Sequence, residues 1–270
     1  MANGKKSRFD MTQVKFNRFL EEGRGQGGGG AYRPWLQIND ISSKGRSHRT
    51  ASDRTGFRTH HLLSDNEYYA YLDAWWRTDV LDIREQYPLL PVELTVAIAA
   101  QLGVRHPRNY KEQLYIPQTT DLVLVTKAGL EPVAIKEDAD YEVPRTREKL
   151  AIQEEFWRRR GFEMKVALSS QLKTQRSLNL LWIYHARRRP IDPPYIPGDN
   201  PLHDYLVKGV LEGITSSVDL ARRADAYLCL ESGAGLAGIR ELLAQRVLDT
   251  NIDKGDISKS CTLSIGVFWK

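Results

Sequence analysis

The chain has two cysteines in 270 residues, Cys229 and Cys261, and no long apolar run. Two distant cysteines are too few for a disulfide framework and form no metal-binding cluster. The longest apolar stretch, near 94–104, is interrupted by Thr95, Gln101 and Gly103, so no segment is expected to span a membrane. The first residues lack the apolar region of a signal peptide. We therefore expect a protein of the reducing cytoplasm.

Acidic residues are scarce near the amino terminus. Residues 1–60 hold twelve Lys and Arg against five Asp and Glu, whereas the whole chain has a net charge of only +5. Because this segment also contains the glycine-rich run 23–30, we expect a flexible or partner-ordered arm whose cations neutralise DNA phosphates. A merely solvated, solubilising face is the alternative. The cations that extend the patch are Lys44, Arg46, Arg49, Arg54 and Arg58.

Two carboxylates and a lysine stand out as candidate catalytic groups: Glu67, Asp121 and Lys136. Mg²⁺ is usually held by one or two carboxylates together with water and phosphate oxygens. A lysine ammonium can orient an attacking water or offset charge that builds on phosphorus. These three groups are the minimum set for metal-assisted hydrolysis of a phosphodiester, provided that the fold brings them together.

Asp121 and Lys136 lie on a predicted β-hairpin. The run 121–125 is rich in β-branched residues, 127–129 has the character of a turn, and 132–136 resumes the strand. A turn centred near Ala128 places Asp121 directly opposite Lys136, where side chains are about 5 Å apart. The alternatives are that Asp121 is only a turn residue and that Lys136 is a solvated strand end.

Glu67 belongs to a predicted helix. Ser64 followed three residues later by Glu67 is a capping-box pattern, and apolar residues then recur at helical spacing through Trp76. The alternative is that Glu67 only bonds back to the backbone of Ser64. Of His60 and His61, which point to opposite faces of an extended segment, one is expected to pack under this helix.

Glu85 is expected on a strand that follows Val80 and Leu81. It could support a metal ion indirectly or simply pair with its neighbour Arg84, and we favour the structural role. Trp75 and Trp76 are expected to belong to the core rather than to a base-stacking surface, because helical periodicity already accounts for one of the two rings.

Several sequence blocks, in order and at matching distances, resemble the TnsA family, the endonuclease subunits of heteromeric transposases in Tn-seven-like transposons. The blocks are Glu22 to Gly27, Pro34-Trp35-Leu36, His60 to Asp65, Val80 to Leu90, Thr120-Asp121-Leu122, and Arg147 to Trp157. The resemblance covers most of residues 20–168 and is weaker beyond. It implies an α/β, restriction-endonuclease-like catalytic domain with a mixed sheet flanked by helices, and it places Glu67, Asp121 and Lys136 at the active-site positions.

One position departs from the expected pattern. Many nucleases of this fold carry Asp or Glu two residues before the lysine, and TnsA relatives carry Gln, but this chain has Ala134. The number of metal ions is therefore open. We expect Glu67 to replace the missing carboxylate and the backbone carbonyl of Ile135 to supply another oxygen to Mg²⁺, for which Mn²⁺ is a substitute. The alternative displaced ligands are Glu137, Asp138 and Asp140.

Residues 1–168 are predicted to form the catalytic domain with its basic arm, and residues 169–270 a second domain. A helix is expected over 169–186 and a stiff proline-rich loop over 187–201, which could instead be the true linker between domains. Three further helices, at 201–213, 216–229 and 235–247, precede a hairpin that includes 261–268. This order suggests a winged helix, and the resemblance implies one. Its candidate DNA-facing residues are Arg240, Gln245 and Arg246, although protein partners are an equal possibility.

The resemblance implies a Mg²⁺-dependent endonuclease that cuts the 5′-end strands at transposon ends in cut-and-paste transposition. It implies transposon-end DNA, a TnsB-like transposase and a TnsC-like AAA+ ATPase as partners, and a bacterial cytoplasmic protein that is nucleoid-associated when acting. A non-catalytic DNA-binding or scaffolding subunit, with Ala134 marking a decayed site, is the alternative. A stand-alone restriction enzyme is a weaker third option.

Overall fold

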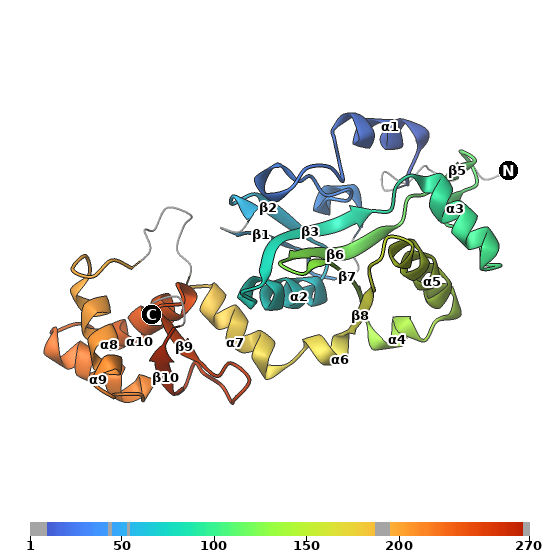
Figure 1. Cartoon of the computed structure of the whole chain (residues 1–270). Coiled ribbons are helices and arrows are strands. Elements are labelled where there is room, and N and C mark those ends of the chain that lie inside the picture. Colours follow the sequence, from blue (N-terminus) through green and yellow to red (C-terminus); the bar gives the residue numbers. More distant parts are fainter. Residues whose placement is uncertain (1–9, 43–44, 53–54, 187–194, 267–270) are drawn as a thin grey trace. The chain divides into compact units, whose positions relative to one another are not determined.

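The computed structural model describes residues 10–42, 45–52, 55–186 and 195–266, which fold as two compact units divided between Lys173 and Thr174 (Figure 1). We predicted the domain boundary between residues 168 and 169. The difference corresponds to the short helix α6 (Ser169–Leu172) and the residue that ends it, Lys173, which the structure groups with the first unit.

The first unit is built on a four-stranded sheet with the order β3-β6-β7-β8. Strand β3 (Val80–Pro88) pairs antiparallel with β6 (Thr119–Thr126), β6 pairs antiparallel with β7 (Gly129–Lys136), and β7 pairs parallel with β8 (Lys165–Leu168). The expected α/β class and mixed sheet flanked by helices are therefore confirmed.

The hairpin of β6 and β7 has a different register from the predicted one. Thr126 pairs with Gly129, so the turn contains only Lys127 and Ala128, and the next pairs run down to Leu122 opposite Val133. Gly129 takes a φ of 131°, which a glycine adopts without penalty, and this allows the second strand to begin there. Continuing this register places Ala134, not Lys136, across from Asp121. The predicted opposition was wrong by two residues.

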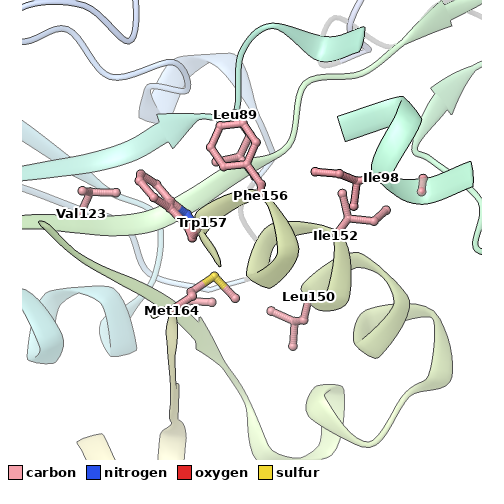
Figure 2. Packing of buried hydrophobic residues seen from close by; sticks show 10 residues of the cluster. Leu89, Ile98, Val123, Leu150, Ile152, Phe156, Trp157 and Met164 are labelled. Atoms are coloured by element: carbon pink, nitrogen blue, oxygen red, sulfur yellow. The ribbon is translucent and has the colours of Figure 1, made fainter. Parts of the chain in front are cut away.

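Helices pack against this sheet and enclose its core. Helix α2 (Asp65–Trp76) contacts β3, β6 and β7, while α5 (Pro144–Arg158) contacts α3 (Val92–Gln101). Figure 2 shows Phe156 and Trp157 of α5 beside Val123 of the sheet. Fully burying each such side chain contributes about 1.5–3 kcal/mol to stability. The cluster comprises Leu89, Ile98, Ala99, Val123, Ala134, Leu150, Ile152, Phe156, Trp157 and Met164.

The amino-terminal segment is folded over residues 10–42. Helix α1 (Gln13–Glu21) begins after the capping residue Thr12, and Phe19 and Trp35 are fully buried in a cluster with Met11. Arg24 is buried as well; it forms ion pairs with Glu22 and Asp40, and its guanidinium lies 3.6 Å from the centre of the Phe19 ring. The prediction of a flexible arm is therefore wrong for residues 10–42.

Shorter elements complete the first unit. Strands β1 and β2 form a hairpin beside α2, and β4 and β5 form a second one. The remaining bounds are η1 (Gly29–Ala31), η2 (Ile38–Asp40), β1 (His48–Ala51), β2 (Thr59–Leu62), β4 (Arg108–Asn109), β5 (Leu114–Tyr115) and α4 (Asp138–Tyr141). Over the described ranges, none of the helices has the length and apolar character that crossing a bilayer requires.

The predicted helix over 169–186 is two helices. Lys173 ends α6 with a non-helical ψ of 67°, and the hydroxyl of Thr174 then accepts the Ser177 N–H and caps α7 (Gln175–Tyr184). Thr174 belongs to the second unit, so the break coincides with the division between the units. Most of the predicted proline-rich loop, residues 187–194, lies outside the described residues.

The second unit contains three helices and a small hairpin after this loop. They are α8 (Pro201–Leu211), α9 (Ser217–Tyr227), α10 (Ala234–Ala244), β9 (Leu248–Thr250) and β10 (Leu263–Ile265). Strands β9 and β10 pair antiparallel, and Ser216 forms an isolated antiparallel bridge with Thr262. The predicted strand beyond residue 266 lies outside the described part of the chain.

Candidate active site

Glu67 lies in the first turn of α2, where local capping orients it. The hydroxyl of Ser64 accepts a hydrogen bond from the Glu67 N–H at 3.1 Å. The Oε2 atom of Glu67 accepts one from the backbone N–H of Leu63 at 2.9 Å and one from Gln86 Nε2 at 3.3 Å. The simpler interpretation, that Glu67 only bonds back to the backbone of Ser64, is therefore wrong, because the described partners of the carboxylate are the Leu63 N–H, the Gln86 amide and the Ser64 hydroxyl.

Asp121 and Lys136 meet although they are not directly paired. The Nζ atom of Lys136 donates to Asp121 Oδ2 at 2.8 Å and to the carbonyl oxygen of Ile135 at 2.7 Å. The same Oδ2 atom accepts the Ile135 N–H at 2.6 Å. A lysine side chain is long enough to reach a diagonal neighbour across two strands. Its ammonium is thus bound between a carboxylate and a backbone carbonyl.

Glu67 is close enough to this pair to interact electrostatically with both members. Its burial and then the negative charge of Asp121 raise the pKa of Glu67 to about 8, while the Leu63 N–H, the Gln86 amide and the Lys136 ammonium act in the opposite direction. A neighbouring carboxylate raises the pKa of a carboxyl because like charges disfavour ionisation, so Asp121 acts on Glu67 at short range. The structure therefore brings together the three residues that the sequence singled out.

The donor set fits a hard cation such as Mg²⁺. Among the described residues, no group of three or more His, Cys, Asp or Glu is placed to hold a metal ion. Mg²⁺ commonly uses only one or two carboxylates and keeps several waters. Here the Lys136 ammonium already contacts Asp121 Oδ2 and the Ile135 carbonyl, so these two oxygens converge on one cationic group.

Two of the three alternative ligands have other partners, and Ala134 serves packing. Ala134 is fully buried in the hydrophobic cluster, so the position that carries a carboxylate in many related nucleases serves packing here. Glu137 accepts hydrogen bonds from Asn66 and Lys173, and Asp138 accepts from Ser170 at the start of α6. Asp140 is exposed. The described contacts thus give no support to a displaced ligand just beyond the strand.

Arg58 is not available as a DNA contact. Its side chain is 7% exposed and forms a fork to both oxygens of Glu85 at 2.8 Å each. The prediction that Arg58 extends a DNA-binding patch was therefore wrong. Arg46 and Arg49 are exposed, and Arg49 donates to Asn39 at 3.2 Å. Lys44 and Arg54, the other two predicted contacts, lie outside the described residues.

The arginines proposed for the second unit are half-buried. Arg240 on α10 donates to the backbone oxygen of Trp182 at 2.6 Å and lies 5.2 Å from its ring centre. Arg246 follows α10 in a left-handed conformation, with φ of 63°. Gln245 accepts the Tyr195 N–H at 2.7 Å. Arg240 and Gln245 therefore have structural contacts within their own unit.

Glu85 has different partners from those that the sequence suggested. Arg84 pairs with Asp82, whereas Glu85 pairs with Arg58 and with Nδ1 of His60 at 2.9 Å. His60 is fully buried and its ring lies 4.8 Å from that of Tyr71 on α2, which confirms that one histidine packs under this helix. The first of the two tryptophans, Trp75, is buried as expected.

Sequence reasoning missed Gln86 and Asn66, which both border the candidate site. Gln86 contacts Glu67 from a neighbouring strand, and Asn66 links the first turn of α2 to Glu137 at 2.8 Å. The spacing of neighbouring residues identifies a helix cap, but it does not identify a side chain such as Gln86, which contacts Glu67 from 19 residues away in the sequence. The only usable signal was strand pairing, because the register of β3 and β6 places Gln86 across from Asp121.

Comparison with known proteins shows that the mixed sheet belongs to an endonuclease domain. The family model described as the TnsA-like endonuclease N-terminal domain matches residues 77–168, a range that includes Asp121 and Lys136. The chain is 33% identical over 261 residues to the transposon Tn7 transposition protein TnsA of Escherichia coli, covering 95% of this chain and 92% of that protein. The chain belongs to the TnsA family.

Proposed function

We propose that the chain is the Mg²⁺-dependent DNA endonuclease of a transposase complex and hydrolyses the 5′-end strands at transposon ends. The observation that carries the proposal is the convergence of Asp121 and the Ile135 carbonyl on the Lys136 ammonium, with Glu67 in electrostatic contact. This constellation matches the oxygen ligands and the cation that phosphodiester hydrolysis needs.

Each residue has a distinct role in this proposal. Glu67, Asp121 and the Ile135 carbonyl would hold Mg²⁺, for which Mn²⁺ can substitute. When bound, the ion would supply Lewis-acid polarisation of the scissile phosphate. Lys136, whose ammonium contacts Asp121 and the Ile135 carbonyl in the structure, would move off these two oxygens when the ion binds and then orient the attacking water or offset negative charge that develops on phosphorus. Hydrolysis then breaks the P–O bond and leaves a hydroxyl and a phosphate on the two DNA ends.

The second unit is proposed to be a winged helix that binds DNA, partner proteins or both. The order of its elements is typical of that fold: helix α8, the bridge residue Ser216, helices α9 and α10, and the hairpin β9–β10. Residues 251–262 would be the wing. In such a domain α10 would be the recognition helix. Arg240 and Arg246 are half-buried, so only the exposed part of each side chain is a candidate for DNA contact.

The relative from E. coli is by its name a transposition protein, which supports a transposition role for this chain. We propose transposon-end DNA, a TnsB-like transposase that processes the other strands, and a TnsC-like AAA+ ATPase as its partners. Such a protein would work in the bacterial cytoplasm and associate with the nucleoid when acting. Cutting both strands at each end would release the element and give cut-and-paste products.

The test is strand-specific cleavage of end-labelled transposon-end DNA by the full chain with its partner transposase and Mg²⁺ or Mn²⁺. Lys136→Ala and Asp121→Ala are expected to abolish the 5′-strand cut while complexes still assemble. Lys127→Ala, a change in the exposed turn of the same hairpin, is the matched control and should cut normally.

Two outcomes would favour other functions. Unchanged 5′ cutting by both variants would support a scaffolding subunit, an alternative that the buried Ala134 motivates because it supplies no ligand. Cleavage by the chain without any partner would indicate a stand-alone enzyme.

A further inference from the structure

Gln86 has an unusual backbone conformation for a residue within a strand. It lies on β3 across from Asp121 and is only 2% exposed, yet its φ is +49°. A non-glycine residue rarely adopts this left-handed region and persists there only where its surroundings determine it. Its carbonyl oxygen accepts the backbone N–H of Trp35 at 3.2 Å, which helps to hold this conformation.

The side-chain amide of Gln86 is fixed at both ends. Its Nε2 atom donates to Glu67 Oε2 at 3.3 Å, and its Oε1 atom accepts the hydroxyl of Thr119 at 2.9 Å. The NH₂ group of an amide can only donate and its oxygen can only accept, so these two contacts orient the amide with its NH₂ group toward Glu67. Gln86 therefore links the helix that carries Glu67 to the strand that carries Asp121.

The two oxygens of Glu67 differ in their contacts. Oε2 accepts from both Leu63 and Gln86, whereas among the described residues Oε1 accepts only from the hydroxyl of Ser64 at 3.4 Å. We propose that Gln86 is a positioning residue of the metal site, which anchors Oε2 and thereby presents Oε1 to the cation. This inference rests on the proposed metal-dependent function and assigns a role that the capping of α2 alone does not provide.

Outer-shell partners that orient a metal ligand typically change metal affinity by about 10–100-fold when they are removed. Gln86→Leu keeps the approximate size of the side chain and removes the donor. We expect it to weaken Mn²⁺ binding to the full chain at least about tenfold, measured by electron paramagnetic resonance titration without DNA. In cleavage assays, the half-saturating Mg²⁺ concentration should rise by a similar factor, with most of the rate recovered at saturating Mg²⁺.

Gln118→Leu is the matched control. Gln118 is also a buried glutamine beside β6, but its Oε1 atom accepts from Gln153 and it has no described contact with Glu67. We expect this variant to keep the Mn²⁺ affinity of the unmodified chain. Equal losses of Mn²⁺ affinity in the two variants would overturn the proposal, because a general loosening of the sheet would then explain both.

Thr119→Val provides a second variant, which removes the hydroxyl that holds the amide of Gln86 and preserves the shape of the side chain. It should weaken Mn²⁺ binding several-fold in the same direction, and it decides the matter if Gln86→Leu does not fold. Normal Mn²⁺ affinity in whichever of the two variants folds would overturn the positioning role. If Lys136→Ala still abolishes cleavage in that case, the nuclease function stands; normal cleavage by Lys136→Ala would refute that function independently.

Discussion

Replacing Arg58 with methionine is expected to lower the free energy of unfolding of the first unit by about 3–5 kcal/mol. Glu85 is fully buried, and Arg58 donates to both of its carboxylate oxygens at 2.8 Å. The same guanidinium also donates to the backbone oxygens of Ile83 and Gly29. Methionine fills a similar volume, so the main loss is the counter-charge. His60 still contacts Glu85, which favours the lower end of the range.

Urea unfolding followed by tryptophan fluorescence measures this change well. Four of the six tryptophans, at 35, 75, 76 and 157, lie in the first unit, so its transition dominates the signal. For a unit of this size, the expected loss corresponds to a melting temperature lower by about 6–20 °C. Arg49→Met, which changes an exposed arginine on β1, is the control and should remain within about 0.5 kcal/mol of the unmodified chain.

The double variant Arg58→Met with Glu85→Gln isolates the role of charge. Removing both charges should restore a large part of the stability, because no ion is then left buried without a partner. Our interpretation would be refuted if Arg58→Met unfolds like the unmodified chain. It would also be refuted if Arg58→Met lowers the free energy of unfolding by the same amount when Glu85 is already replaced by Gln.

Three further predictions follow from the described contacts. Burial alone would raise the pKa of Glu85, but His60 and Arg58 lower it to about 2 from an ordinary value of 4.5. The ionised Glu85 therefore stabilises the fold fully above pH 4.5, and this stabilisation is lost as pH falls toward 2. Glu85→Gln should remove this pH-dependent change, which amounts to about 3 kcal/mol in the free energy of unfolding. Asn179 is buried and binds the backbone at Ile252, Gly255 and Ile257. Asn179→Leu should lower the free energy of unfolding by about 1–3 kcal/mol for each of these backbone groups that stays buried without a hydrogen-bond partner. It should also speed hydrogen exchange at the Ile257 amide. If the exposed Arg46 and Arg49 contact DNA phosphates, alanine at either should reduce the slope of log affinity against log salt by about 1, measured by fluorescence anisotropy with transposon-end DNA.

Short-range patterns in the sequence were enough to place the elements that carry the candidate site. The hydroxyl of Ser64 caps α2 as its spacing with Glu67 indicated, and runs rich in β-branched residues on either side of a turn located the strands of Asp121 and Lys136. These features depend on residues only a few positions apart. The exact register did not follow, because it depends on whether Gly129 ends the turn or begins the strand, and glycine is compatible with both.

Long-range pairing explains what could not be predicted. Glu85 and Arg58 are 27 residues apart, and nothing in either local segment marks them as partners. Our interpretation of the first 60 residues rested on their net charge and glycine content and did not consider Phe19 and Trp35, whose buried rings belong to the core of this segment. Arg24 can be buried there because Asp40 and Glu22 neutralise it, and that compensation is visible only in three dimensions.

The two-residue turn at Lys127 and Ala128 limits the insertions that this protein can tolerate. Exposed loop tips usually accept insertions. Here a single inserted residue that displaced β7 along β6 would move every following side chain to the opposite face of the sheet, and Lys136 would point away from Asp121. We therefore expect family members that keep this site to vary in length outside this turn, because the turn also determines where the Lys136 ammonium lies.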